Sequence, residues 1–315
     1  MSLPPEFALI ARHFRPLAAQ GGLGLLDDAA LLTPPPGREL VLAADAMVAD
    51  VHFLPDDPPE TIGRKLLRVN LSDLAAMGAE PLAYLLTVAL PHATPDAWLE
   101  RFAAGLAEDQ RLFDIAVLGG DTVSTPGPLT LSLTILGHLP PGEAIRRSGA
   151  QPGDDLWVSG TIGDGALGLR ALRGQLADDG SLASRYRLPQ PRLALGQALR
   201  GLAHAMLDVS DGLVQDCGHL ARHARCGAEI EAALIPLSPM ARAAGDRAAI
   251  LSGGDDYELL FAAPPHAAPR IEAASRASAT PVTRIGRFTT APPAVSVLDE
   301  QGLDITPARG GWSHT

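Results

Sequence analysis

The feature that most constrains the fold of this chain is a regular alternation of short apolar runs with longer segments of helical periodicity. Runs of strand length alternate with stretches in which apolar residues return every three or four positions. In the first half we predict strands at residues 38–48, 82–90, 115–118 and 129–139, and helices at 60–77 and 95–112. Strands and helices that alternate in this way are typical of α/β proteins, in which helices cover a sheet.

A second cycle of strands and helices follows a segment that predicts a domain connection. Residues 140–153 are rich in Pro and Gly and contain the basic pair Arg146-Arg147. Beyond it we predict a strand at 155–159, a helix at 164–172, a polar loop to 190, a helix at 191–204, a strand around Met206 and a helix at 212–225. Two further strand–helix passes complete the chain. We therefore expect two α/β domains, residues 1–140 and 141–315.

Composition and charge limit the classes of function. Of the 315 residues, 46% are hydrophobic and 19% are charged, which predicts globular domains with substantial cores. The net charge is −11, and Lys65 is the only lysine. We therefore expect no nucleic-acid partner, because such binding depends on basic surfaces. An acidic chain of this kind is better suited to holding metal cations.

The sequence also bears on the compartment. No run reaches the roughly 18 apolar residues that a membrane span needs. The first sixteen residues predict a short amphipathic helix and no signal peptide, because charged residues such as Glu6 and Arg12 interrupt the apolar ones. The two cysteines, Cys217 and Cys226, fit a reducing environment. We expect a cytoplasmic protein with no membrane partner.

Three familiar motifs give little support to any function. Residues 163–168 match GxGxxG, but the acid expected about 20 residues later falls in the polar loop at Asp178-Asp179, so we interpret the glycines as a tight strand-to-helix turn. His219 and His223 lie four residues apart on a predicted helix, but Leu220 stands where HExxH has its glutamate. The sequence contains no GxxxxGK[ST] phosphate-binding loop.

Carboxylates recur at or near the ends of apolar runs. One such aspartate is typically a helix cap or a turn residue, whereas a whole set of them suggests a shared function. Ligands bind at the carboxyl ends of strands in α/β folds, and magnesium favours carboxylate and phosphate oxygens. We predict a site for metal and phosphate built from Asp27-Asp28, Asp45, Asp73, Asp121, Asp208 and Asp211.

Two short motifs strengthen the phosphate interpretation. Residues 208–213 (DVSDGL) resemble a helix start at which Asp211 caps the helix while Ser210 and nearby amides face an anion. Residues 119–122 (GGDT) end the predicted strand at 115–118 with two glycines, which allows the backbone to approach a phosphate closely.

Together these motifs resemble one family, the thiamine-monophosphate kinases. The similarity runs from about residue 6 to the C-terminus, and several of the motifs also occur in the wider superfamily of aminoimidazole-ribonucleotide synthetase. The run NLSDLAAMGA together with the GGxDYEL run narrows the resemblance to the thiamine enzymes. The matching segments are 51–53 (VHF), 70–79 (NLSDLAAMGA), 119–122 (GGDT), 147–150 (RSGA), 158–160 (VSG), 208–213 (DVSDGL) and 252–259 (SGGDDYEL).

The resemblance implies a fold and a reaction. The fold is α/β (α+β) with two domains: a mixed N-terminal sheet with helices that pairs in a homodimer, and a C-terminal α/β domain that completes the ATP and substrate site. The reaction is ATP-dependent phosphorylation of thiamine phosphate to thiamine diphosphate, with several Mg²⁺ ions and with ATP as co-substrate.

The resemblance also implies roles for individual residues. Magnesium would be held by Asp28, Asp45, Asp73, Asp121, Asp208 and Asp211. ATP would contact Gly120, Asp121, Arg147 and Ser210, and thiamine phosphate would contact His52, Asp255 and Trp312. Catalysis would depend on Asp121, Asp208 and Arg147. Trp312 also admits a second interpretation, as a C-terminal hydrophobic anchor.

The sequence departs from the family pattern at a few positions. Leu26 replaces a glycine before the acidic pair, and Ala43 and Ala44 replace hydroxyl residues before Asp45. Asp255 replaces the glutamate of GGEDYEL, and the chain ends in Ser-His-Thr where the family has Asp-His-Phe. We expect an active enzyme with weakened metal affinity. Two alternatives stay open: another ATP-using enzyme of the superfamily, such as a ribonucleotide cyclo-ligase, or a sensor that binds nucleotide or thiamine phosphate without turnover.

Overall fold

The computed structural model describes residues 5–313, and the chain divides into two compact units. Unit 1 comprises the described part of Met1–Leu74 together with Glu80–Pro141. Unit 2 comprises Ala75–Ala79 and the described part of Gly142–Thr315. Each unit has its own sheet, as the alternating sequence pattern predicts.

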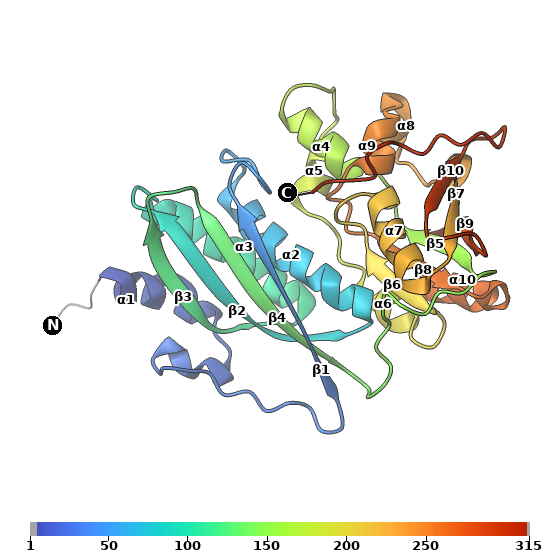
Figure 1. Ribbon diagram of the computed structural model, residues 1–315. Helices are drawn as coiled ribbons and strands as arrows, with labels where there is room; N and C mark the ends of the chain where they lie inside the picture. Colours follow the sequence, from blue (N-terminus) through green and yellow to red (C-terminus); the bar gives the residue numbers. More distant parts are fainter. Residues whose placement is uncertain (1–4, 314–315) are drawn as a thin grey trace. The chain divides into compact units, whose positions relative to one another are not determined.

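Unit 1 is built on a four-stranded mixed sheet with helices on one face (Figure 1). Strand β2 lies between β4, to which it is antiparallel, and β3, to which it is parallel, while β1 pairs antiparallel with β4. The sheet order is therefore β1 (Glu39–Val48), β4 (Thr130–Leu139), β2 (Glu80–Pro91) and β3 (Val117–Thr125). The helices are α2 (Pro59–Met77) and α3 (Asp96–Phe113).

Alternation along the strands separates a buried face of this sheet from an open one. Leu86 and Val88 of β2 are buried, whereas Leu85 and Thr87, which point the other way, are exposed. Beside the helices, a buried ion pair joins α2 to α3: Arg68 Nη2 lies 3.0 Å from Asp109 Oδ1. The open face is the one that carries the candidate site of unit 1.

Unit 2 contains a six-stranded sheet that is covered on both faces. Only the β10–β7 pair is parallel. The sheet order is β10 (Val295–Leu298), β7 (Gly227–Glu231), β9 (Val282–Thr289), β5 (Asp155–Ser159), β8 (Leu259–Ala263) and β6 (Ala205–Asp208). One core cluster includes Leu220 of α7 (Leu213–Ala224), and another includes Ile271 of α10 (Ala268–Ala277). The remaining helices are α4 (Asp164–Leu172), α5 (Ser181–Arg187), α6 (Leu193–Ala198), α8 (Pro239–Ala244) and α9 (Arg247–Ser252).

The predicted elements agree with this architecture, with three corrections. The predicted strand at 115–118 is longer, because β3 continues to Thr125. The predicted helix at 191–204 is only α6, six residues long. The loop predicted before residue 190 contains α5. At the N-terminus, α1 (Pro5–Leu9) and the π-helical turn after it form the predicted short helix, and no helix within residues 5–313 is long and apolar enough to cross a membrane.

Candidate functional site

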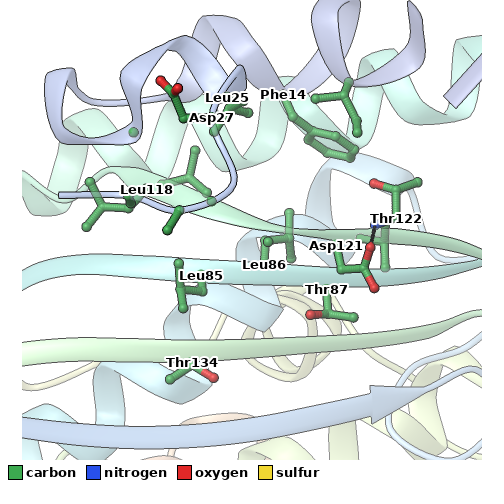
Figure 2. Close-up of a pocket in the computed structure, with 18 of the residues that line it drawn as sticks. Phe14, Leu25, Asp27, Leu85, Leu86, Thr87, Leu118, Asp121, Thr122 and Thr134 are labelled. Atoms are coloured by element: carbon green, nitrogen blue, oxygen red, sulfur yellow. Dashed lines mark hydrogen bonds between the residues drawn. The ribbon is translucent and has the colours of Figure 1, made fainter. Parts of the chain in front are cut away.

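A pocket of about 750 Å³ lies over the open face of the unit 1 sheet (Figure 2). The segment that precedes β1 forms one wall, and strands β2, β3 and β4 form the other. Four of the predicted site residues line it together, namely Asp27, Asp28, Gly120 and Asp121. Residues about 90 positions apart in the sequence therefore share one cavity.

Asp121 lies within β3, not after a strand as the sequence predicted. It pairs with Thr87 of β2, and its exposed carboxylate accepts a hydrogen bond from the Thr122 N–H at 2.9 Å. Gly120 before it is required by packing: a Cβ there would lie 1.7 Å from the carbonyl oxygen of Leu86. The glycine thus lets the two strands approach, which is a different reason from the phosphate contact that the sequence suggested.

Asp45 lies at the other edge of the same sheet. It pairs with Leu133, which is fully buried, so its side chain points to the face that the helices cover. The Asp45 N–H donates to Asn70 Oδ1 of α2 at 3.1 Å. Burial raises the pKa of the Asp45 carboxyl, and nearby His52 partly offsets this. Asp73 is half-buried on the same helix as Asn70.

His52 follows β1 and is held in one orientation. Its Nδ1 accepts a hydrogen bond from the Val48 N–H at 3.0 Å, so a neutral ring carries its proton on Nε2. The buried Lys65 donates from Nζ to the His52 carbonyl at 3.0 Å. The side chain therefore presents an N–H donor away from the strand.

Unit 2 gathers a second group of predicted residues at the carboxyl end of β6. Asp208 is the last residue of that strand and is buried, in agreement with the predicted position. The loop that follows pairs with residues 254–258: the Asp255 N–H donates to the Ser210 carbonyl at 2.9 Å, and the Tyr257 N–H donates to the Val209 carbonyl at 2.8 Å. Ser210 and Asp255 thus lie side by side although they are 45 positions apart.

Trp312 lies against the same loop. Its N–H donates to the Asp211 carbonyl at 2.9 Å, and Gln215 Nε2 contacts both Asp211 Oδ2 (3.2 Å) and the Trp312 carbonyl (2.6 Å). The Trp312 side chain is 52% exposed, which does not fit a buried hydrophobic anchor. Its position leaves the indole ring accessible to a ligand.

The start of α7 corrects the predicted helix cap. The N-cap residue is Gly212, and Asp211 does not cap the helix through its side chain. The carboxylate of Asp216, a residue that the sequence analysis missed, accepts the N–H groups of Asp211 and Gly212 at 3.0 Å each. Burial raises the pKa of Asp216 to about 7, and the charges of Asp208 and Asp211 add to the effect.

Arg147 is exposed on the segment that leads to β5, in the same unit. The preceding Arg146 carbonyl accepts the Met206 N–H at 3.0 Å, which ties this segment to β6. The pKa of His219 on α7 is lowered by burial first and then by Arg222 and Arg147, so Arg147 lies near that helix. The structure thus places Arg147 near the helix that follows Ser210 and Asp211.

The six predicted metal ligands do not form one cluster. Within residues 5–313, no three His, Cys, Asp or Glu side chains come together as a metal site. Two of the aspartates lie at opposite edges of the unit 1 sheet. In unit 2, the negative charges of Asp208 and Asp211 help to raise the pKa of the buried Asp216 carboxyl, a repulsion that a divalent cation would relieve. Oxygen donors of this kind fit magnesium.

The motifs set aside in the sequence stay outside this group. Gly163 is the N-cap residue before α4 and has a φ of +90°, as a tight strand-to-helix turn requires. His219 Nδ1 contacts Arg222, and His223 is exposed. Leu26 has a φ of −115°, so this position does not demand a glycine for its backbone conformation.

Two family matches together span most of the chain. Residues 26–139 match the family described as AIR synthase related protein, N-terminal domain, and residues 151–298 match its C-terminal domain. With the two sheets and the loop pairing described above, they define the class: this is a two-domain AIR synthase related protein.

Individual relatives narrow the class. A thiamine-monophosphate kinase from Caulobacter vibrioides is 48% identical over 99% of this chain and 91% of its own length. The crystal structure of a thiamine-monophosphate kinase from Stenotrophomonas maltophilia K279a is 42% identical, covers 93% of this chain and 96% of its own, and superposes with a TM-score of 0.84. A structure described as AaThiL complexed with AMPPCP and TMP is 30% identical, covers 100% of this chain and 99% of its own, and gives a TM-score of 0.79. The chain belongs to the thiamine-monophosphate kinase family, a family of enzymes.

Proposed function

We propose that this enzyme transfers the γ-phosphoryl group of ATP to thiamine monophosphate, yielding thiamine diphosphate and ADP. The observation that carries the proposal is the group at the carboxyl end of β6, where Asp208 ends the strand and the loop after it joins Ser210 to Asp255 and Asp211 to Trp312 by backbone hydrogen bonds. The relative of known structure complexed with AMPPCP and TMP supports it, since an ATP analogue and the acceptor would occupy one enzyme.

The reaction does not require the protein to remove a proton from the acceptor phosphate. A phosphate monoester has a second pKa near 6, so its oxygen is already an anionic nucleophile at neutral pH. In a direct in-line transfer, an acceptor phosphate oxygen bonds to the γ-phosphorus while the bond from that phosphorus to the β–γ bridging oxygen breaks. The obstacle is repulsion between two anions, so positioning and charge neutralisation dominate.

Magnesium fits the residues that this chain offers. We assign its ligands among Asp28, Asp45, Asp73, Asp121, Asp208 and Asp211. When bound, the ions would neutralise phosphate charge and orient the oxygens, which a chain without a phosphate-binding lysine loop needs. Gly120, Asp121, Arg147 and Ser210 would contact the nucleotide, and Arg147 would add a fixed positive charge beside it.

The thiamine end has a different chemistry, because its rings are flat and one carries a positive charge. The exposed indole of Trp312 suits stacking on such a cation. The Asp255 carboxylate would accept a hydrogen bond from the substrate, and the Nε2–H of His52 would donate one. Each of these contacts would determine specificity more than rate.

The experiment combines ATP, magnesium and thiamine monophosphate with purified protein and follows thiamine diphosphate by chromatography after oxidation to fluorescent thiochrome. We expect product from the wild type and a rate at least about 100-fold lower from Asp121→Asn, because charge neutralisation contributes on that scale. Asp121 is exposed, so the variant should fold normally. If neither protein forms product while ATP still binds, the kinase assignment is wrong and a sensor or another substrate takes its place.

A further inference from the structure

The loop of residues 253–258 has a backbone conformation that must be held in place. Asp255 and Tyr257 have φ values of +68° and +52°, in the left-handed region that non-glycine residues rarely adopt. Alternate side chains of this loop point in opposite directions. Asp256 and Glu258 are fully buried, whereas Asp255 and Tyr257 are half-buried, with Tyr257 Oη 3.2 Å from Asp255 Oδ1.

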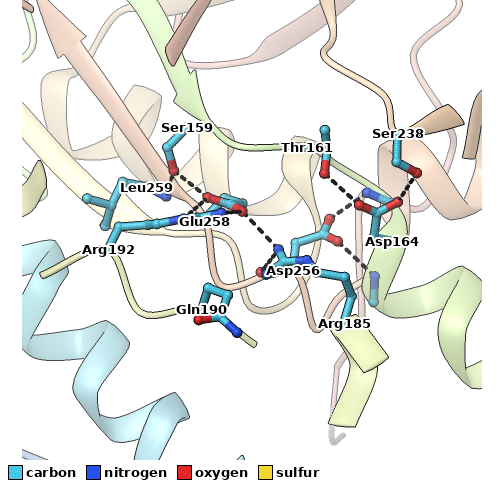
Figure 3. Close-up of polar contacts among 12 residues, drawn as sticks. Ser159, Thr161, Asp164, Arg185, Gln190, Arg192, Ser238, Asp256, Glu258 and Leu259 are labelled. Carbon is cyan, nitrogen blue, oxygen red and sulfur yellow. Dashed lines mark hydrogen bonds and ion pairs between the residues drawn. The ribbon is translucent and has the colours of Figure 1, made fainter. Parts of the chain in front are cut away.

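The two buried carboxylates anchor the loop at two places (Figure 3). Asp256 accepts the N–H groups of Gly163 and Gly165 at 2.7 and 3.0 Å, which ties the loop to the start of α4. Glu258 accepts the Ser159 hydroxyl at 2.6 Å, and the same hydroxyl accepts the Leu259 N–H at 2.8 Å. Both anchors thus fix the backbone on either side of Tyr257.

Two arginines converge on Glu258, namely Arg185 from within α5 and Arg192 from just before α6. Arg192 donates to both carboxylate oxygens through Nε and Nη2, with Nε 2.7 Å from Oε2. Arg185 Nη2 donates to Glu258 Oε1 at 2.8 Å and also to the Asp256 carbonyl at 3.1 Å. Gly160 leaves the necessary room, since a Cβ there would lie 2.1 Å from Glu258 Oε1.

The need to fill the core does not explain a cluster of Glu258 with two arginines. A buried carboxylate with two guanidinium groups is costly to desolvate, and apolar residues of similar volume can replace buried ion pairs without loss of stability. What the bidentate fork supplies is direction, because it fixes a carboxylate in a plane and at a distance. Here the fork of Arg192 fixes the carboxylate of Glu258, which lies three positions after Asp255.

We infer that Arg192, Arg185 and Glu258 are positioning residues that hold the 253–258 loop so that Asp255 faces thiamine monophosphate. The inference rests on the proposed function, since Asp255 is the proposed substrate contact. In the proposed function, none of these three residues is assigned a contact with the reacting phosphates. They act through Asp255, so their loss should weaken recognition of the thiamine substrate and leave nucleotide recognition unchanged.

The test is steady-state kinetics with each substrate varied in turn at saturating concentration of the other, on wild type, Arg192→Lys, Arg192→Met and Asp255→Ala. We expect Arg192→Met to raise the KM for thiamine monophosphate about tenfold or more, with the KM for ATP changed less than about twofold. Arg192→Lys keeps the charge but loses the fork, and it should fall between wild type and Arg192→Met. Glu258→Gln is excluded from the set, because it would leave two arginines without their charged partner and so destabilise the fold.

A matched control separates positioning from loss of stability. Ile230→Val removes one methylene from the core of unit 2, on β7, three strands away from β8. It should lower the melting temperature with both KM values unchanged. If Arg192→Met raised both KM values equally, or changed neither while only lowering the melting temperature, the cluster would be structural and the inference wrong.

Asp255→Ala distinguishes this failure from failure of the proposed function. Suppose that wild type makes thiamine diphosphate and that Asp255→Ala raises the KM for thiamine monophosphate while Arg192→Met does not. In that case the inferred positioning role is wrong and the proposed function stands. If Asp255→Ala has no effect on that KM, the assignment of Asp255 as a substrate contact fails, and the positioning inference fails with it.

Discussion

At the residue scale, the chain uses buried carboxylates to shape loops, a role that sequence motifs do not reveal. Asp216 and Asp256 each accept two backbone N–H groups, and burial raises the pKa of both to about 7. Asp216 follows Asp211 and Asp256 follows Asp255, and the functional roles were assigned to Asp211 and Asp255, which belong to recognisable motifs. The only sign of these buried carboxylates in the sequence was a second acidic residue beside the first one or a few positions after it.

The pKa of Asp256 makes stability depend on pH. Burial raises it from 3.8 to about 7, and the N–H groups of Gly163 and Gly165 partly offset the rise. Between these values the folded carboxyl keeps its proton and the unfolded one does not, so the free energy of unfolding falls as pH increases from about 4 to 7. One such group contributes at most about 1.4 kcal/mol per pH unit.

We expect thermal unfolding, followed by circular dichroism without magnesium, to give a higher melting temperature at pH 5.5 than at pH 7.5. Asp256→Asn has no carboxyl to titrate and should reduce this difference, although Asp216 will still contribute. Glu300→Gln, which changes an exposed acid in the turn after β10, should keep the wild-type difference. An Asp256→Asn curve with an undiminished pH dependence would show that Asp256 is ionised in the folded protein.

At the element scale, the strongly periodic segments were predicted well and the edge of unit 1 was not. Residues 164–172 and 155–159 have the bounds that the sequence predicted. The predicted strand ended too early, at residue 118, because the last seven residues of β3, GGDTVST, lie at a sheet edge and lack buried alternation. Helix α5 was missed because only Leu182 and Tyr186 of its seven residues are buried, too few to establish a period.

The close approach of β2 and β3 predicts an asymmetry between two adjacent glycines. A Cβ at Gly120 would lie 1.7 Å from the Leu86 carbonyl oxygen, whereas one at Gly119 would lie 3.5 Å from the Leu85 side chain, an ordinary contact. We expect Gly120→Ala to lower the free energy of unfolding by about 3 kcal/mol, since overpacking a strand pair forces the backbone to shift.

Urea unfolding without nucleotide or magnesium measures this effect, and Gly119→Ala is the matched control, with a change of about 0.5 kcal/mol or less. Equal, small effects of the two variants would contradict the packing explanation for Gly120 and leave its proposed contact with the nucleotide as the reason for the glycine.

At the scale of the whole molecule, the open face of the unit 1 sheet is apolar enough to predict a partner. Leu42 is 62% exposed, and Leu40, Leu85 and Val123 are also exposed on this sheet. Side chains of this kind on one face mark an interaction site more often than a free surface. We propose that a second copy of the chain covers it, as the family resemblance implies, and that Leu42→Asp would shift the protein to monomers in size-exclusion chromatography with light scattering.

We propose further that the second copy completes the metal site, because of where two of the proposed ligands lie. Asp45 lies on β1 and Asp121 on β3, the two edges of a four-stranded sheet, so strand spacing alone puts their backbones about 14 Å apart. Carboxylates at that separation cannot bind one magnesium ion at the ~2.1 Å distance it requires. Asp45 also points to the helix-covered face and Asp121 to the open face, so the two can share an ion only if the second copy brings its own Asp121 to Asp45. In such a dimer, Asp45→Asn and Asp121→Asn should each be inactive alone. Co-expression should restore about a quarter of wild-type activity, because half of the dimers are mixed and each mixed dimer keeps one intact site. Activity that stays at the level of the separate variants, in dimers shown by mass spectrometry to be mixed, would mean that each copy builds its metal sites alone.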